Sequence, residues 1–156
     1  MTTPDQRAEQ VIGKMTTKIP KGQGLVACVQ DGDILYVSGH GPEDDEGNLI
    51  FVGRVGKDVT LEQGYLAARQ VGIQLLRSVQ DYLGTLNRVE RILKVLAFVN
   101  SADDFHEQPK VVHGFSDLMV EIFGEKGKHA RSAIGTSNLP RNQPVEIEMI
   151  VKIKDA

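Results

Sequence analysis

Apolar residues recur at helical spacing in three segments of the chain. The clearest segment opens with Thr60-Leu-Glu-Gln63, a capping box in which the Thr60 hydroxyl accepts a hydrogen bond from the backbone of Gln63 and the Gln63 side chain reaches back. Its apolar positions then repeat every three or four residues as far as Gly84, a residue type that favours a helix end. This spacing predicts helices over residues 60–84, from about 108 to 124, and over 4–15.

Most of the remaining segments have the patterns of β-strands. The turn Asp31-Gly32-Asp33 indicates a hairpin between the first two strands, 25–30 and 34–38. Residues 89–100 are apolar on both alternating faces in their second half, which indicates a strand in the middle of a covered sheet. Every second residue from Val145 to Ile153 is apolar, so one face of the last strand belongs to the core. The expected strands are 25–30, 34–38, a short one near 49–52, 89–100, 131–137 and 145–153.

The order of these elements predicts the fold class. Two amphipathic helices against one mixed sheet give a two-layer α+β domain. At 156 residues the chain has the length of one domain and is long enough to bury a hydrophobic core. The first helix has only a short apolar stripe. Residues 1–18 are therefore interpreted as an N-terminal helical extension, and residues 19–156 as the domain proper.

The second face of the predicted sheet has no obvious cover. We expect Ala97, Val99, Ile134 and Ile150 to leave this face partly apolar, and no third helix of comparable strength remains to pack against it. An uncovered apolar face of this kind predicts self-association.

Composition narrows the classes of function. The chain has 18 basic and 21 acidic residues, a formal charge of −3 and 5% aromatic residues, which argues against nucleic-acid binding. No apolar run approaches the ~20 residues of a membrane span, and the first residues lack the apolar stretch of a signal peptide. A single cysteine, Cys28, excludes an intrachain disulfide. These features predict a cytoplasmic protein.

Conventional catalytic and metal-binding motifs are absent. The four histidines are scattered at spacings that match no metal-ligand pattern, so they are interpreted as surface or helix-end residues and no metal is expected. Two clusters remain: Ser38-Gly39-His40-Gly41-Pro42, where glycines allow close approach of the backbone to a ligand, and Arg131 with Glu146 and Glu148. On residue chemistry alone, Arg131 and Glu146 on adjacent strands would make a surface salt bridge worth under ~1 kcal/mol.

Three stretches together resemble one known family. They are I-L-Y-V-S-G-H-G-P (34–42), R-I-L-K-V-L-A-F-V-N (91–100) followed by Asp103-Asp104-Phe105, and A-R-S-A-I-G…L-P…V-E-I-E-M-I-V (130–151). In this order they resemble the reactive-imine deaminase family, also called YjgF, UK114 or endoribonuclease L-PSP. The resemblance extends over residues 25–153, and its last stretch is the most specific.

The resemblance implies a fold, an assembly and an activity. The fold is the chorismate mutase-like α+β fold, and three subunits associate through their sheets into a barrel-like core with ligand clefts at the subunit boundaries. The reaction is hydrolysis of reactive 2-imino or enamine acids to 2-keto acids and ammonia. It needs neither a metal nor an organic cofactor.

The resemblance also implies roles for particular residues. Arg131 matches the arginine that grips the substrate carboxylate, a task that suits the fork of donors on a guanidinium. Glu146 matches the acidic residue that activates the attacking water, which is ordinary general-base work. Gly39, with Ser38 before it, falls in the loop that lines the cleft, and the backbone of Ala133 matches a position that meets the substrate.

Three positions depart from the family pattern. Leu25 stands where the family has a cleft tyrosine, Ser116 falls in the region of a helix asparagine, and His129 replaces the usual proline before Ala-Arg. The chain is therefore interpreted as a divergent branch with an altered cleft, in which Leu25 and Ser116 would contact the ligand.

Three functions remain open from the sequence. The first is the imine deaminase, which Arg131 and Glu146 favour and Leu25 weakens. The second is a non-catalytic trimer that binds a small carboxylate through Arg131. The third, the ribonuclease or translation-inhibitor activity behind one family name, lacks the basic groove and stacking aromatics of single-stranded RNA sites.

Overall fold

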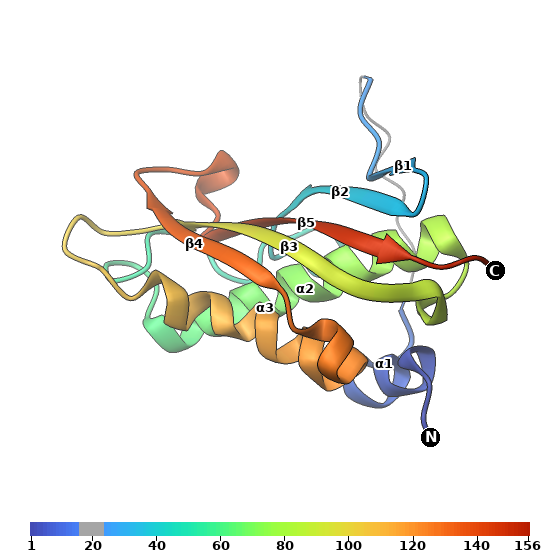
Figure 1. Cartoon of the computed structure of the whole chain (residues 1–156). Helices are drawn as coiled ribbons and strands as arrows, with labels where there is room; N and C mark the ends of the chain where they lie inside the picture. Colours follow the sequence, from blue (N-terminus) through green and yellow to red (C-terminus); the bar gives the residue numbers. More distant parts are fainter. Residues whose placement is uncertain (16–23) are drawn as a thin grey trace.

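The computed structural model describes residues 1–15 and 24–156, which form one mixed sheet with its long helices on one face (Figure 1). The strand order is β1-β2-β5-β3-β4, in which β3 and β4 are parallel and the other neighbours are antiparallel. The α-helices are α1 (Pro4–Ile12), α2 (Leu61–Leu83) and α3 (Gln108–Phe123). The strands are β1 (Cys28–Asp31), β2 (Ile34–His40), β3 (Val89–Asn100), β4 (Ala130–Thr136) and β5 (Val145–Ile153). Three 3₁₀ turns are η1 (Leu86–Arg88), η2 (Gly124–Gly127) and η3 (Pro140–Asn142).

The predicted α+β class is confirmed, with three local differences. The prediction of a short strand near 49–52 is wrong, because Leu49 makes only an isolated bridge to Glu43. The first helix ends at Ile12, where Gly13 takes a positive φ of 86° and its amide closes the last turn. The first strand begins at Cys28 instead of residue 25. The capping box at Thr60 forms as predicted, which fixes the start of α2.

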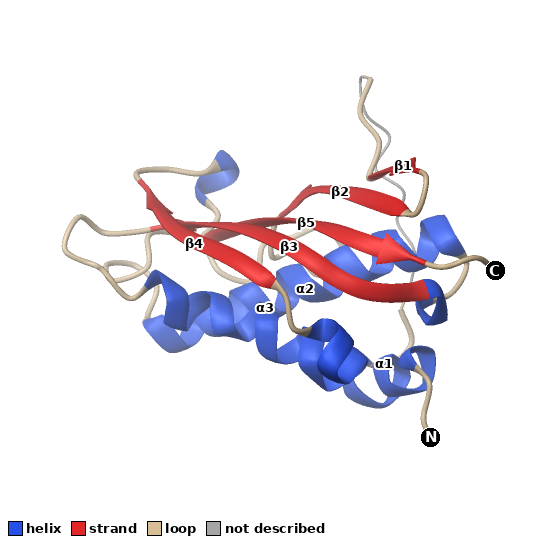
Figure 2. Cartoon of the chain, viewed as in Figure 1, coloured by secondary structure: helices blue, strands red, loops and turns tan. Residues whose placement is uncertain are grey.

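The hydrophobic core lies between the sheet and the two long helices (Figure 2). Ala97 and Val99 belong to this core and are fully buried, so placing them on the uncovered face was wrong. The reason is register: Ala97 lies opposite Ile147 and Val99 opposite Val145, on the face that β5 turns toward the helices.

The uncovered face of the sheet is made by the alternate residues. Leu96 and Phe98 of β3 lie on it and are half-buried, together with Ile150 of β5. Tyr36 and Ile134 are 47% and 46% exposed on the same face. No α-helix of the described residues covers this surface (Figure 1). The apolar face that predicts association therefore exists. Ile134 and Ile150 lie on it as predicted, whereas Leu96 and Phe98 take the places expected for Ala97 and Val99.

Helix α1 packs on the outside of the domain, against α3 and η1. Asp5 accepts a hydrogen bond from the Leu86 backbone amide at 2.7 Å and another from the Thr85 hydroxyl. Arg7 donates to the Ile122 carbonyl, and Ala8 is buried. The extension is thus tied to the domain by polar contacts. The boundary expected between residues 18 and 19 lies outside the described residues.

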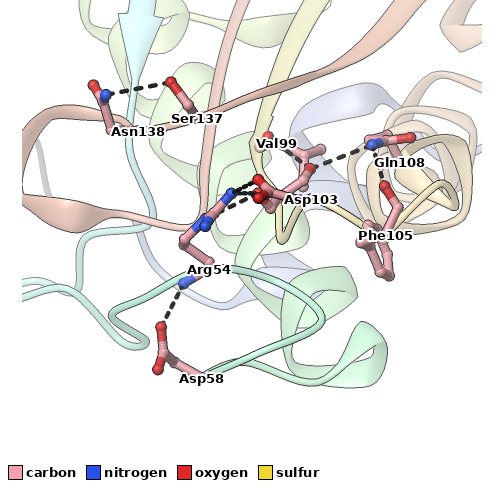
Figure 3. Close-up of polar contacts among 9 residues, drawn as sticks. Arg54, Asp58, Val99, Asp103, Phe105, Gln108, Ser137 and Asn138 are labelled. Carbon is pink, nitrogen blue, oxygen red and sulfur yellow. Dashed lines mark hydrogen bonds and ion pairs between the residues drawn. The ribbon is translucent and has the colours of Figure 1, made fainter.

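The start of α3, which carries part of the candidate site, is held by a polar network (Figure 3). The Arg54 Nε donates to the Ser101 carbonyl at 2.9 Å, and Arg54 also forms an ion pair with Asp103. Gln108 is the first residue of α3, and its side chain donates to the Phe105 carbonyl at 2.9 Å and to the Ser101 hydroxyl at 3.4 Å. Because the Asp103 side chain is 98% exposed, its ion pair adds little stability. The hydrogen bonds from the Arg54 and Gln108 side chains to backbone carbonyls fix the position of the first turn of α3.

Helix α3 comes close to the backbone of α2 at Gly114, which suggests a stability test. A Cβ at Gly114 would lie 2.0 Å from the Tyr65 carbonyl oxygen, whereas a Cβ at Gly64 would lie 3.2 Å from a methyl of Val111. Gly114→Ala should therefore lower the free energy of unfolding by about 3 kcal/mol, since a backbone atom cannot move aside. Gly64→Ala should be close to neutral, because helix propensity offsets a mild clash. Urea denaturation measures both, and equal losses would contradict this packing.

Candidate functional site

An open groove of about 450 Å³ lies between α3 and the start of β4. We call it the Arg131 groove. It is lined by His113, Ser116, Val120, Lys128, His129 and Arg131. Its lining has no acidic side chain, so its chemistry favours an anionic ligand.

Arg131 is held in the groove by neutral acceptors of α3. Its Nη1 donates to the Ser116 hydroxyl at 3.1 Å and to His113 Nδ1 at 3.2 Å, and its Nη2 donates to the Pro109 carbonyl at 3.4 Å. Burial lowers the pKa of the Arg131 guanidinium while the charge of Asp117 raises it, and a guanidinium keeps its proton in proteins. Among the described residues, none of the ion pairs includes Arg131. Its positive charge is therefore not matched by a carboxylate within hydrogen-bonding distance.

Ser116 links Arg131 to His129. His129 Nδ1 lies 2.6 Å from the Gly127 carbonyl, which only accepts, so Nδ1 carries the proton of the neutral ring. His129 Nε2 then accepts the Ser116 hydroxyl proton at 2.9 Å, while the Ser116 oxygen accepts from Arg131. Burial lowers the pKa of His129. The hydrogen bond to the Gly127 carbonyl raises this pKa, and the positive charge of Arg131 lowers it further. The neutral imidazole is thus the form that this geometry favours.

Sequence reasoning missed most residues of this groove. His113 and His129 were interpreted as surface or helix-end histidines, and Lys128 and Val120 were not singled out. A weak signal existed, because His113 and Ser116 are one helical turn apart, and His129, which directly precedes β4, is two residues from Arg131. Only the packing of α3 against β4 brings the two pairs together.

A second polar cluster surrounds Glu146 at the junction of β2 and β5. A Cβ added to Gly39 would lie 3.3 Å from the Glu146 carboxylate, so this glycine lets the backbone approach the acid. Gln143 Nε2 donates to Glu146 Oε1 at 3.0 Å. Gly41 leaves room for the Gln143 amide, because a Cβ there would lie 2.0 Å from Gln143 Oε1. The carboxylate is therefore held through one oxygen.

The other expected site residues lie around these two clusters. The Ser38 hydroxyl donates to the Val26 carbonyl at 2.8 Å, so it is already occupied by the backbone. Leu25 precedes β1 and is 75% exposed. Ala133 lies on the edge strand β4, partly buried and opposite Ala97.

Arg131 and Glu146 do not meet within one chain. Strand β3 lies between β4 and β5, so the two strands are not adjacent as the sequence interpretation assumed. Arg131 lies opposite buried Val95 and contacts α3, whereas Glu146 lies opposite Phe98 on the uncovered face. The surface salt bridge between Arg131 and Glu146 is therefore not formed.

Within residues 1–15 and 24–156, no group of three or more His, Cys, Asp and Glu side chains is placed to hold a metal. In the same part of the chain, none of the helices combines the length and apolar character that a membrane span requires.

Comparison with known proteins identifies the family. The family model described as "YjgF/chorismate mutase-like, putative endoribonuclease" matches residues 26–152. The chain belongs to the YjgF family. It is 40% identical over 143 residues to Protein TCP17 of Trypanosoma cruzi, a match that covers 91% of this chain and 89% of that protein.

Solved structures match the fold to different degrees. The Agrobacterium tumefaciens protein Atu1372, of unknown function, has a TM-score of 0.87 at 34% identity, covering 97% of this chain and 92% of that one. At that coverage the match reaches into α1. RidA from the Antarctic bacterium Psychrobacter has a TM-score of 0.58 at 23% identity, covering 89% and 97%, and shares the fold.

The partial burial of His129 predicts how stability depends on pH. In the unfolded chain a histidine titrates near 6.5, and burial places the folded pKa below that value. As pH falls through about 6.5, the unfolded state takes up a proton that the folded state resists, so stability falls until the lower folded pKa is reached. His40 has the same direction of shift, mainly from burial.

His129→Gln should therefore flatten the loss of stability between about pH 7 and 5 by a fraction of a kcal/mol per pH unit, because the ring is only partly buried. Urea denaturation at a series of pH values measures this slope. An unchanged slope would mean that His129 titrates alike in both states.

Proposed function

We propose that this protein hydrolyses small reactive 2-imino acids to 2-keto acids and ammonia, with Arg131 as the carboxylate anchor and Glu146 as the base. The observation that carries the proposal is the state of Arg131, whose guanidinium lines an open groove and contacts only neutral acceptors. An arginine whose charge no carboxylate matches, in a groove without acidic lining, favours a small anion. We also propose that the protein works in the cytoplasm, where 2-imino acids would form during amino-acid metabolism.

Glu146 supplies the second half of the proposed chemistry. A water molecule next to the free oxygen of Glu146 loses a proton to the carboxylate as it attacks the imine carbon. Glu146 then returns this proton to the nitrogen of the tetrahedral adduct. The second proton of the former water passes from the adduct hydroxyl to the same nitrogen, the C–N bond breaks, ammonia leaves, and the carbon keeps the oxygen as a ketone. The close approach of Gly39 and the hydrogen bond from Gln143 support this role, because they hold the carboxylate in one orientation.

A site that uses both residues needs two subunits. Because Arg131 and Glu146 lie on opposite faces of one sheet, we propose that Arg131 of one subunit meets Glu146 of its neighbour in a homotrimer. The uncovered face with Tyr36, Phe98 and Ile134 supplies an apolar surface for that assembly.

The assembly can be tested by mixing two inactive variants. If the site is shared, co-expressed Arg131→Ala and Glu146→Gln subunits should rebuild about one intact site in four, because random trimers place a normal arginine beside a normal glutamate. Turnover measured on the co-purified mixture should reappear, while each variant alone stays inactive. Light scattering that gives a monomer mass at micromolar concentration, or mixtures that stay inactive, would contradict a shared site.

The single variants test the chemistry. Arg131→Ala should remove both 2-keto acid binding and turnover, because loss of a charged partner in a cleft costs roughly 2–5 kcal/mol. Glu146→Gln should abolish ammonia release yet retain binding, since it keeps the size of the side chain and removes the base. Arg69→Ala is the matched control, as Arg69 pairs with Glu121 outside the groove. Ammonia release from imino acids generated in place is compared with the spontaneous rate.

A wild-type rate equal to the spontaneous rate would exclude the enzyme. Binding of a 2-keto acid that depends on Arg131 would then identify a trimeric carboxylate-binding protein. The exposure of Leu25, at the position of the family tyrosine, is the feature that favours this second function.

A further inference from the structure

Two serine–histidine pairs are built into this fold with the same geometry. Ser116 Oγ lies 2.9 Å from His129 Nε2, and Ser78 Oγ lies 2.7 Å from His40 Nε2. In each pair a backbone carbonyl at 2.6 Å fixes Nδ1 as the protonated nitrogen. A hydroxyl beside an unprotonated Nε2, with the ring oriented by a third group, is the arrangement that activates a nucleophile.

The surroundings separate the two pairs. Ser78 is only 9% exposed and lies on α2 outside the groove, so its pair serves the packing of the domain. Ser116 and His129 both line the Arg131 groove, where a small molecule can reach them. Arg131 Nη1 also donates to the Ser116 oxygen, which places a fixed positive charge beside the atom that would react.

We propose that Ser116 and His129 are a nucleophile and general base that hydrolyse small acyl esters in the Arg131 groove. This activity goes beyond the proposed imine hydrolysis and needs neither Glu146 nor a neighbouring subunit. The ester is small because the groove holds about 450 Å³.

The reaction balances with water as the only co-substrate. Ser116 Oγ attacks the ester carbonyl carbon and its proton passes to His129 Nε2. The carbonyl oxygen becomes an oxyanion, which the Arg131 guanidinium stabilises. The adduct collapses, the alcohol leaves with the proton from His129, and the acyl group stays on Ser116. Water then attacks the acyl carbon, again giving a proton to His129, and the acid departs as the serine recovers its hydrogen.

The environment of His129 suits this proton transfer. Burial, aided by the charge of Arg131, lowers the pKa of His129, so the ring is neutral and able to accept a proton at physiological pH. The Phe115 ring packs edge-on against the imidazole at 5.7 Å and limits its motion.

Covalent labelling gives a direct test on the full-length protein. With 4-nitrophenyl acetate or a small sulfonyl fluoride as the probe, mass spectrometry of peptides should find the label on Ser116. Ser116→Ala should abolish that label and reduce the ester turnover above background by about 100-fold or more, as should His129→Gln. Ser78→Ala is the matched control, which should leave both unchanged.

A cysteine at the same position provides a second measurement. In Ser116→Cys, the adjacent His129 should promote the thiolate and make the introduced thiol react rapidly with iodoacetamide at neutral pH. Ser78→Cys should react slowly, because that position is buried. The native Cys28 will not interfere, since burial, with Asp81 nearby, raises its thiol pKa to about 11.

The outcomes also separate this proposal from the imine reaction. Absence of label at Ser116, or alkylation of Ser116→Cys no faster than of Ser78→Cys, would overturn the nucleophile–base pair. If such a protein still releases ammonia from 2-imino acids above the spontaneous rate, the proposed imine chemistry stands. If Ser116 is labelled but no imine turnover is found, the ester-hydrolysing pair stands and the proposed imine hydrolysis fails.

Discussion

The parallel pairing of β3 with β4 determines where the Arg131 groove is. Two parallel strands need a crossover connection, and here α3 provides it beneath the sheet. The chain therefore returns to the sheet directly above the helix that it has just formed, with η2 as the connection. The side chains at the start of β4 on that face meet α3, which explains why Arg131 contacts Ser116 and His113. If β4 paired antiparallel elsewhere, the two sides of the groove would be separated.

Much of the fold was predictable from local signals. The capping box at Thr60, the glycine at 84 and the alternation from Val145 to Ile153 each specify a local structure without help from the rest of the chain. The apolar run at 49–52 was misleading because apolar character alone does not supply a partner strand. Its backbone makes an isolated bridge and a turn contact, in which the Ile50 amide donates to the Pro42 carbonyl.

The faces of β3 were less predictable for a physical reason. Its second half is apolar at both odd and even positions, so periodicity does not say which set faces the helices. The register with β5 decides, and it buries Ala97 and Val99 while Leu96 and Phe98 face outward. The lining of the Arg131 groove also depends on contacts between segments that are distant in the sequence. The resemblance pointed to Arg131 and Ser116, but the partnership of His113 and His129 with them depends on tertiary packing that no short stretch of sequence encodes.

The separation of Arg131 from Glu146 follows from the same register and has a chemical consequence. Opposite charges within about 4 Å would attract each other strongly enough to form an ion pair, and a paired guanidinium would bind a substrate carboxylate less well. The sheet prevents this within one subunit, because it places the two groups on opposite faces with β3 between their strands. Neutral acceptors hold Arg131, and an amide holds one oxygen of Glu146, so the two groups do not neutralise each other in an ion pair. In the proposed trimer the two charges approach only across a subunit boundary, where a substrate that carries both a carboxylate and an imine can lie between them.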